Sequence, residues 1–328
     1  MVLSRRDLVK SPLALAGASV IGVAATAVQA QPQAPVARRE TIALWPKPPA
    51  GQAHPGQPEV IEQTSSDPAY SSRRLKGISK PRLEVFPAAN PNGAAMLIIP
   101  GGGFAWNYFE HEGYYVADAL NRAGITCFVL FYRLAQEGWP DPAGVGPADA
   151  QRAMRVIRSE AAHFRIDPAR LGVMGFSAGG FLTAQLATRH DAAFYPPVDA
   201  RDSISARPLL AAPIYPVQTV DPAYAYEGVA PTLFGGKVTT ADIATWSPDR
   251  NVTAVTAPTF LAHAEDDGLV PVANTTRLRD ALVAQKIPVE THLFAHGGHG
   301  FGVPNDPGAR GLWIPLFLNF ARGQKLLT

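Results

Sequence analysis

The stretch that most constrains the fold is Leu171–Phe181, which reads Leu-Gly-Val-Met-Gly-Phe-Ser-Ala-Gly-Gly-Phe. Its first half is a short apolar run typical of a buried strand, and Leu182 and Leu186 follow one helical turn apart. Ser177 is therefore expected on a sharp, strained strand-to-helix turn, with its hydroxyl at the carboxyl end of a parallel sheet. The flanking glycines fit because a Cβ there would collide with the neighbouring strand or helix. The alternative is an ordinary glycine-rich turn.

Strands and helices alternate along most of the chain. Apolar or alternating runs predict strands near residues 83–85, 94–99, 125–132, 171–176, 209–214, 259–262 and 290–294. Helical spacing predicts helices near residues 115–124, 150–164, 182–186 and 275–284, and another after Trp313. This order predicts an α/β protein with a mostly parallel central sheet and helices on both faces. At 328 residues the chain is long enough for one such domain, predicted over residues 61–328.

The first 60 residues are not expected to belong to that domain. Ser4–Lys10, with its paired arginines, resembles a twin-arginine export signal, and residues 1–30 end in small residues suited to cleavage. The weakly hydrophobic segment is too short and too rich in Gly and Ala to favour the alternative, a retained membrane anchor. A periplasmic or secreted bacterial protein is therefore predicted. Residues 31–60 are rich in proline, which predicts an extended segment lying mostly on the surface.

Composition and charge exclude several classes of protein. With 47% hydrophobic and 17% charged residues, the chain is globular rather than disordered. Without residues 1–30 it has 26 Lys and Arg and 26 Asp and Glu, so nothing electrostatic favours binding to nucleic acid or to an anionic membrane. The single cysteine, Cys127, lies in an apolar run and is expected to be a buried structural thiol.

A triple glycine follows the strand predicted at 94–99, in the stretch Ile98–Phe104. Backbone N–H groups approach a substrate oxygen closely only where side chains are absent, so this loop suits an oxyanion hole. A phosphate loop is the obvious rival, but no Gly-Lys-Ser/Thr sequence follows. Dinucleotide spacing also fails, because Trp106 occupies the third glycine position. A plain structural turn remains the other alternative.

Two polar clusters follow the last two predicted strands. The first, His263–Pro271, contains Glu265, Asp266 and Asp267, any of which would be placed to orient a histidine. A solvated acidic loop or a cation site would explain the same run of acids.

The second cluster, His296–Gly302, surrounds His299 with glycines, which suits a mobile loop that lays an imidazole over Ser177. Its two histidines would otherwise suggest a metal site, but no third ligand stands at suitable spacing. His111 and His263 are expected to be structural or to line the pocket. The order serine, acid, histidine is that of the α/β-hydrolase fold and differs from both major orders of serine proteases.

These motifs resemble the exported α/β-hydrolases of the acetyl-xylan-esterase-like branch, from about Ile42–Pro46 to the C-terminal helix. The resemblance implies that Ser177 is the nucleophile and His299 the general base. It also implies that Asp267 is the orienting acid, because the family's acid stands three residues before the valine of Val-Pro. One departure is Phe181, where relatives often carry a histidine. This difference affects the expected shape of the acyl pocket and therefore the choice of substrate. The matching stretches are Pro100–Phe104, His111–Gly113, Tyr132–Leu134, Asp149–Ala153, Gly175–Gly180, Ser247–Asp249, Asp266–Asp267 with Val270–Pro271, and Gly298–Gly302.

The family further implies a serine esterase that works through an acyl-enzyme, with the oxyanion held by N–H groups of Gly102, Gly103 and Ala178. No cofactor or metal is implied. The expected substrate is a small-molecule or oligosaccharide ester, with a short acyl group such as acetyl on a carbohydrate such as xylan. Phe104 and Trp106 are the candidate substrate-binding residues, and the aromatic residues that follow them would either stack on a sugar or pack a cap.

Two rival functions remain open. An exported peptidase related to prolyl oligopeptidases would share the serine and acid motifs, although those enzymes usually carry an aromatic residue where this chain has Ala178. A non-catalytic carbohydrate-binding protein on a hydrolase scaffold is the second rival, and the intact set of Ser177, Asp267 and His299 argues against it. Residues 217–245, rich in Pro, Ala and Gly, are a candidate cap over the pocket.

Overall fold

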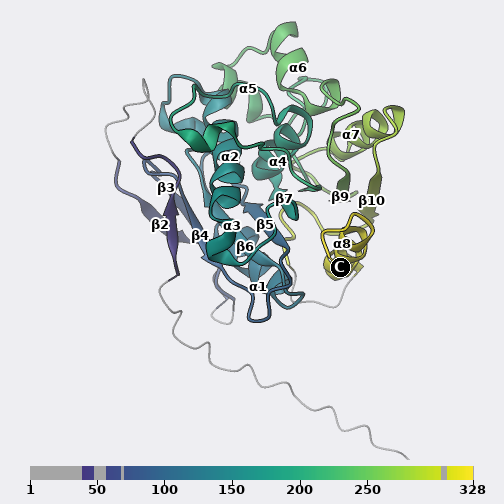
Figure 1. Ribbon diagram of the computed structural model, residues 1–328. Helices are drawn as coiled ribbons and strands as arrows, with labels where there is room; N and C mark the ends of the chain where they lie inside the picture. The colour runs from purple at the N-terminus through teal and green to yellow at the C-terminus, as the bar shows by residue number, and fades with distance from the viewer. Residues whose placement is uncertain (1–38, 48–56, 68–69, 304–308, 328) are drawn as a thin grey trace, which may run out of the picture. The chain divides into compact units, whose positions relative to one another are not determined.

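An eight-stranded sheet forms the centre of the computed structural model, which describes residues 39–47, 57–67, 70–303 and 309–327 (Figure 1). The two strand pairs nearest one edge, which join the first three strands, are antiparallel, and the other five pairs are parallel. The predicted α/β-hydrolase architecture is therefore confirmed. In spatial order the strands are β1 (Thr41–Ala43), β4 (Arg82–Phe86), β6 (Thr126–Phe131), β5 (Ala95–Ile99), β7 (Leu171–Phe176), β8 (Ala211–Ile214), β9 (Thr259–Ala264) and β10 (Val289–Phe294).

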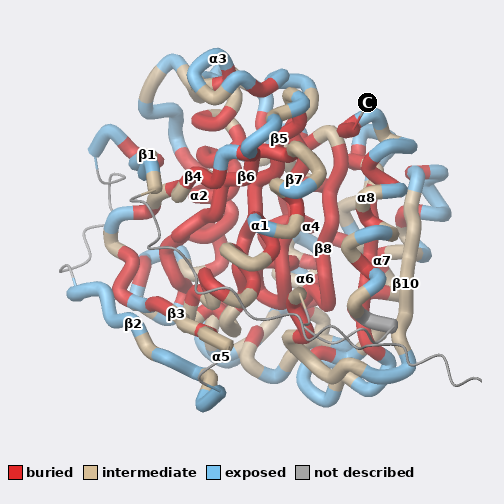
Figure 2. Tube along the Cα trace, turned by 90° about the horizontal axis from the view of Figure 1, so that it is seen from below, coloured by how far each residue is buried: buried red, intermediate tan, exposed pale blue. Residues whose placement is uncertain are grey.

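Helices cover both faces of this sheet. In Figure 1, α2 (Pro142–Ser159), α4 (Ser177–Arg189) and α7 (Ala273–Ala284) lie above the sheet, while α1 (Tyr115–Asn121) and α8 (Trp313–Gly323) lie below it. Every residue of β5, β6, β7 and β9 is buried, as expected for parallel strands covered on two sides (Figure 2).

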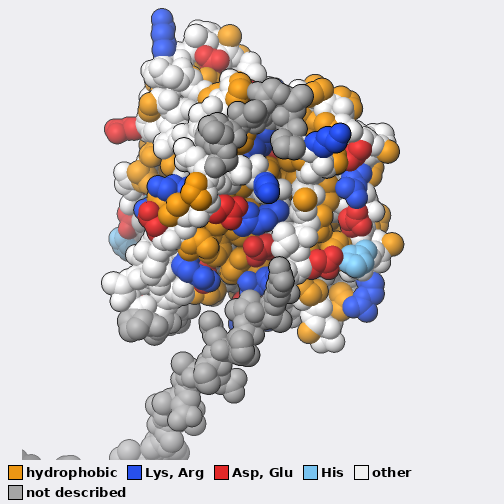
Figure 3. All heavy atoms as spheres, turned by 90° about the vertical axis from the view of Figure 1, so that its left-hand side faces the viewer, with side chains coloured by type: hydrophobic (Ala, Val, Ile, Leu, Met, Phe, Trp, Pro, Cys, Tyr) orange, Lys and Arg blue, Asp and Glu red, His pale blue; other side chains and the backbone are white. Residues whose placement is uncertain are grey.

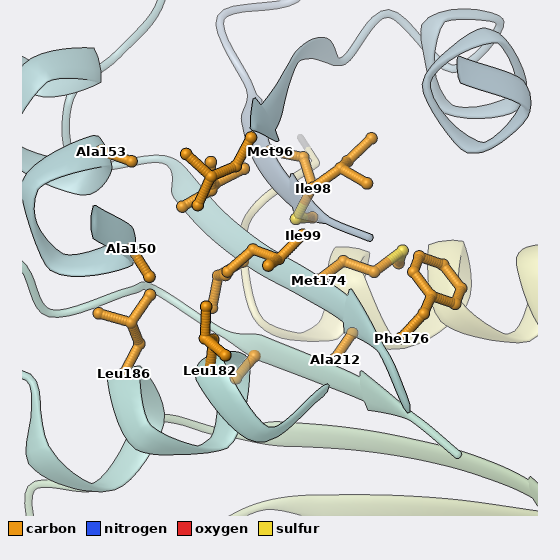
Figure 4. Close-up of a cluster of buried hydrophobic side chains, with 14 of the residues drawn as sticks. Met96, Ile98, Ile99, Ala150, Ala153, Met174, Phe176, Leu182, Leu186 and Ala212 are labelled. Carbon is orange, nitrogen blue, oxygen red and sulfur yellow. The ribbon is translucent and has the colours of Figure 1, made fainter. Parts of the chain in front are cut away.

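The main core forms where two of these helices meet the central strands. The predicted helical spacing is confirmed, because Ala150 and Ala153 of α2 and Leu182 and Leu186 of α4 point into one apolar cluster (Figure 4). Side chains of β5, β7 and β8 complete the cluster from the sheet. Burying each large aliphatic side chain contributes about 1.5–3 kcal/mol, so this packing holds the turn between β7 and α4 in place.

The remaining elements are short. A two-stranded antiparallel sheet, β2 (Val60–Gln63) with β3 (Arg73–Lys76), bridges to the main body through Leu75 and Asn107. A π-helix, Glu110–Tyr114, runs directly into α1. The other helices are α3 (Ala161–Phe164), α5 (Val229–Phe234), α6 (Thr240–Trp246) and four 3₁₀ turns, Ala135–Glu137, Ala200–Ser203, Pro248–Arg250 and Ala309–Leu312.

Part of the proline-rich segment joins the core, which differs from the expected surface position. β1 pairs with β4, and Leu44 and Trp45 behind it are buried. The Trp45 indole N–H donates a hydrogen bond of 2.8 Å to Asp149 Oδ1, and Asp149 also holds Arg133 in a buried ion pair. Local proline content gives no sign of this tertiary partner.

Residues from Arg39 onward form one compact unit. The predicted export signal, residues 1–30, lies outside the described residues and stays a prediction. Among the helices that are described, none is long and apolar enough to span a membrane. On the side of the molecule seen in Figure 3, basic and acidic side chains are interspersed rather than gathered into a patch of one sign.

Candidate active site

Ser177 occupies the strained turn that its sequence context predicted. Phe176 ends β7 in extended geometry, Ser177 has a φ of 51°, and α4 begins at once. A Cβ on Gly175 would lie 2.3 Å from the carbonyl oxygen of Gly179. A Cβ on Gly179 would lie 2.1 Å from the carbonyl oxygen of Ile99. Both glycines are therefore required for β7, β5 and α4 to pack this closely.

A continuous chain of hydrogen bonds joins Ser177, His299 and Asp267. His299 Nε2 lies 2.8 Å from Ser177 Oγ, and His299 Nδ1 lies 2.7 Å from Asp267 Oδ2. An ionised carboxylate only accepts hydrogen bonds, so Nδ1 carries the proton and Nε2 is left to accept the serine hydroxyl. This tautomer is the one that removes a proton from the serine.

Asp267 is the one of the three competing acids that reaches His299. Its side chain is fully buried and accepts hydrogen bonds from the backbone N–H groups of Leu269 and Val270 and from His263. Burial opposes ionisation of this carboxyl, but the hydrogen bonds from His263 and His299 outweigh it and hold its pKa well below the usual range. Asp267 is therefore a fixed negative charge behind His299.

His263, expected to be structural or to line the pocket, is a second imidazole on the same carboxylate. Its Nε2 lies 3.0 Å from Asp267 Oδ2 and 3.1 Å from the Val270 carbonyl oxygen, both of which accept. Nε2 therefore carries a proton, and Nδ1 lies 2.7 Å from the hydroxyl of Thr275 on α7. His263 has no exposed surface, so it anchors Asp267 from inside the protein.

The glycine-rich loop that carries His299 is held mainly by side chains from elsewhere. Asp266, one of the rival acids, accepts the N–H groups of Gly297 and Gly298 at 2.9 and 2.8 Å. The His111 Nε2–H donates to the Gly300 carbonyl at 2.7 Å, which leaves Nδ1 to accept from the Tyr70 hydroxyl. Trp313 donates to the Gly302 carbonyl at 2.8 Å.

The two histidines of this loop do not converge on a common site. The side chain of His296 is 90% exposed, whereas His299 is committed to Ser177 and Asp267. Across the described part of the chain, no group of three or more His, Cys, Asp or Glu side chains is arranged to hold a metal ion.

The triple-glycine loop presents free backbone donors next to Ser177. Gly102 and Gly103 have φ values of 132° and 61°, and a Cβ on Gly102 would lie 2.2 Å from the Trp106 carbonyl oxygen. The Ala178 N–H lies in the first turn of α4, where no acceptor exists within the helix. Within the described residues, the N–H groups of Gly102 and Gly103 have no acceptor either. All three are available to a developing oxyanion.

A buried pair, Glu112 and Tyr215, ties the oxyanion loop to the histidine loop. Glu112 accepts the Gly101 N–H at 2.7 Å through Oε2 and the Tyr215 hydroxyl at 2.9 Å through Oε1. Tyr215 in turn accepts the Gly302 N–H at 3.1 Å, and its ring lies edge-on to that of His299, with 5.1 Å between centroids. Burial, reinforced by the Glu112 charge, raises the pKa of Tyr215 well above its usual value.

Sequence reasoning missed this pair. The one available signal was the position of Glu112 within a stretch shared with the resembled family. Nothing local to Tyr215 marks it, because the contact joins residues 103 positions apart.

These groups open onto a pocket of about 520 Å³, here called the Ser177 pocket. Phe104 is not on its wall, because it is buried against Phe181 behind the oxyanion loop; this corrects its expected substrate-binding role. The predicted cap contributes Tyr226 to the wall. The lining comprises Tyr70, Ser72, Arg74, Gly102, Gly103, Ala105, Trp106, Tyr108, His111, Glu112, Gln136, Ser177, Tyr226, Leu269, Val270, His299 and Gly300.

Trp106 does line the pocket, but its ring is not bare. The Arg74 guanidinium carbon lies 3.9 Å and the Lys76 ammonium 4.4 Å from the ring centroid. Arg74 also donates to the Tyr108 hydroxyl at 3.0 Å. Phe109, the last aromatic residue after the loop, is buried against Tyr114 instead of facing the pocket.

Comparisons with known proteins agree with this architecture. The model of the BD-FAE family matches residues 85–282, which include Ser177 and Asp267 and stop before His299. An acetylxylan esterase of Xylanibacter ruminicola is 31% identical over 232 residues, covering 70% of this chain and 45% of that protein. Endo-1,4-beta-xylanase B of Butyrivibrio fibrisolvens is 34% identical over 218 residues, covering 64% of this chain and 33% of that protein.

A solved structure covers more of the chain. The acetyl ester-xyloside bifunctional hydrolase from Caldicellulosiruptor lactoaceticus superposes with a TM-score of 0.72 at 29% identity, covering 89% of this chain and 98% of that one. The chain spans a third to about half the length of the curated relatives it matches. The resemblance that the sequence motifs indicated is confirmed.

Proposed function

The chain belongs to the BD-FAE family, and from that premise we propose that it is a serine carboxylic-ester hydrolase working through an acyl-enzyme. The observation that carries this proposal is the hydrogen-bonded chain from Ser177 through His299 to Asp267 beside three free backbone N–H groups. The same geometry supplies a nucleophile, a base, a fixed counter-charge and an oxyanion site within one pocket.

In the acylation half, His299 Nε2 takes the hydroxyl proton as Ser177 Oγ bonds to the ester carbonyl carbon. Negative charge moves onto the carbonyl oxygen, where the N–H groups of Gly102, Gly103 and Ala178 stabilise it. The bond to the ester oxygen then breaks, and His299 gives its proton to the departing alcohol. Asp267 stabilises the imidazolium throughout, since its carboxylate stays ionised.

In the second half, a water molecule enters where the alcohol left. His299 removes a proton from this water, whose oxygen attacks the acyl carbon, and the oxyanion again lies at the same three N–H groups. The acid is released as Ser177 recovers its proton from His299. Apart from the ester and the water molecule, every group used in these steps is one of the protein groups described in the active site.

For substrate, the proposal is a short acyl group, acetyl above all, on a carbohydrate such as acetylated xylan. Support comes from relatives named acetylxylan esterase and acetyl ester-xyloside hydrolase. The pocket of about 520 Å³ falls within the size range of small-molecule sites and is lined by both aromatic and polar side chains.

The deciding experiment measures acetate release from acetylated xylo-oligosaccharides by the purified protein, with Ser177→Ala as control. We expect release by the wild type and a loss of about 10⁴–10⁶-fold in the variant. If the Ser177→Ala variant retained most of the wild-type activity, the assignment of Ser177 as the nucleophile would be wrong. Uptake of a fluorophosphonate probe by the wild type, without acetate release, would keep the activated serine and discard the carbohydrate substrate; aryl esters and short peptides would then be assayed.

The proposal includes twin-arginine export, supported by Arg5 and Arg6 in Ser4–Lys10. In a bacterium with that pathway, the protein is expected in the periplasm or medium with its amino terminus near Gln31. Replacing both arginines by lysine should retain it in the cytoplasm. Mass spectrometry of the exported protein and cell fractionation measure these two outcomes.

A further inference from the structure

A second hollow lies beside the Ser177 pocket, on the other side of Trp106. Its volume is about 450 Å³, close to that of the first. The two share Ala105, Trp106 and Gln136, so these residues form a common wall. We call the second one the Lys76 hollow, and its lining consists of Gln57, Lys76, Ala105, Trp106, Gln136, Glu137 and Gly138. A substrate that crosses this wall would occupy both hollows.

Two cations of β3 stand on either side of that wall. Arg74 lines the Ser177 pocket and Lys76 lines the Lys76 hollow. Side chains two residues apart on a strand point to the same face, about 6.6 Å apart along the strand. Both therefore reach the Trp106 ring, whose π-face attracts cations and holds them in place.

The two cations differ in how their charge is compensated. Arg74 donates two hydrogen bonds to Glu62 Oε2, with a shortest distance of 2.7 Å, so its charge is neutralised. Lys76 forms no ion pair with any described carboxylate. The acid nearest along the lining, Glu137, is turned to the backbone, where it accepts the Gly77 N–H. Within the described residues, the Lys76 ammonium group therefore has no ion-pair partner, although the Glu137 carboxylate lines the same hollow.

We propose that the Lys76 hollow is a subsite for a carboxylate-bearing sugar, a hexuronic acid attached close to the acylated residue of the substrate. This inference rests on the proposed esterase function and specifies its substrate further. The ammonium group of Lys76 would pair with the carboxylate, and the side-chain amides of Gln57 and Gln136 would hydrogen-bond sugar hydroxyls. Trp106 does not serve as a bare stacking platform, because Arg74 and Lys76 lie over its ring.

The expected effect is small but specific. Lys76 is exposed, and exposed ion pairs change an equilibrium by about two- to five-fold. We therefore expect acetyl esters on a glucuronic-acid-branched xylo-oligosaccharide to be hydrolysed with a kcat/KM about two- to five-fold above that for the unbranched oligosaccharide. The preference should largely disappear in 1 M salt, where the Debye length is about 3 Å.

Three variants isolate the charge. Lys76→Gln should remove the preference while leaving kcat/KM for p-nitrophenyl acetate unchanged, because that ester does not reach the hollow. Lys76→Arg should retain the preference. Lys80→Gln removes the same charge from an exposed lysine that lines neither hollow, so it should behave as the wild type.

Equal kcat/KM values for the two oligosaccharides in the wild type would overturn the inference, as would a preference that survives in Lys76→Gln. If neither oligosaccharide is hydrolysed, the subsite can still be tested by binding. Calorimetry then measures the affinity of Ser177→Ala for each of the two deacetylated oligosaccharides. Tighter binding of the branched one, lost in the Ser177→Ala/Lys76→Gln protein, would support the subsite although the esterase proposal had failed. Equal binding would overturn it.

Discussion

Removing the hydroxyl of Tyr215 tests whether the oxyanion loop and the histidine loop are held together by one buried bridge. Tyr215→Phe deletes two hydrogen bonds, one to Glu112 and one from the Gly302 N–H, while the ring that packs beside His299 stays. A bond to a charged acceptor is worth about 1.5–3 kcal/mol and a neutral one about 1 kcal/mol. The free energy of unfolding should therefore fall by about 2.5–4 kcal/mol.

The effect on catalysis follows from what the bridge positions. Gly101 begins the oxyanion loop and Gly302 ends the stretch that carries His299. When the bridge is lost, we therefore expect both the oxyanion N–H groups and the His299 imidazole to shift relative to Ser177. A displacement of about 1 Å costs roughly a hundred-fold in rate. We expect kcat for p-nitrophenyl acetate to fall about ten- to a hundred-fold, with KM changed much less, because binding contacts remain.

Tyr132→Phe is the matched control. Its buried hydroxyl donates to the Pro100 carbonyl at 2.9 Å, next to the oxyanion loop, but no described contact of this hydroxyl reaches the histidine loop. It should lose about 0.5–1.5 kcal/mol of stability and little kcat. Urea unfolding and steady-state kinetics on both variants measure the difference. If Tyr215→Phe retained at least half of the wild-type kcat, or if Tyr132→Phe lost as much, the bridge would not be a positioning device.

Three further predictions concern the frame around the site. Asp149→Ala leaves Arg133 buried without its partner (side chains 0% and 1% exposed), and urea unfolding should show a loss of about 3–5 kcal/mol; a loss under 1 kcal/mol would contradict the ion pair. Gly179→Ala places a Cβ against backbone and should abolish folding as seen by circular dichroism, whereas Gly323→Ala, in open space, should change stability by at most about 1 kcal/mol. The lowered pKa of Asp267 means that its stabilising contribution is complete above the ordinary pKa of about 3.9 and is lost as pH falls further. Between pH 5 and 3 the Tm of Asp267→Asn should therefore fall less than that of the wild type, and parallel curves would refute this.

Local pattern was sufficient for those features that depend on neighbours in sequence. The turn at Ser177 follows from an apolar strand, two glycines and a helix start, all within eleven residues. The parallel sheet follows from the spacing of apolar residues, which alternates along the chain between the pattern of a strand and the pattern of a helix. Glu265, Asp266 and Asp267 stayed equivalent at this level, because only the path of the loop after β9 decides which carboxylate turns inward to His299 and which holds the histidine loop.

Features made by distant pairs left no local trace. Trp45 lies in a proline-rich stretch, and its burial depends on Asp149, 104 residues away. Phe104 and Trp106 are both aromatic and two residues apart, yet the positive φ of Phe104 turns it into the core while Trp106 faces the pocket. Aromatic content therefore predicted the neighbourhood of the pocket but not which ring lines it.

The topology itself explains why the site is assembled where it is. Five strands, β5, β7, β8, β9 and β10, are adjacent and parallel, so their carboxyl ends all meet at one edge of the sheet. Each end supplies one part: Gly102 follows β5, Ser177 follows β7, Tyr215 follows β8, Asp267 follows β9 and His299 follows β10. Ser177 and Tyr215 both have positive φ, so the backbone is strained directly after two neighbouring strands, β7 and β8. Because Tyr215 stands between the nucleophile and the acid, the bridge it makes with Glu112 is the contact through which this edge of the sheet fixes both loops at once.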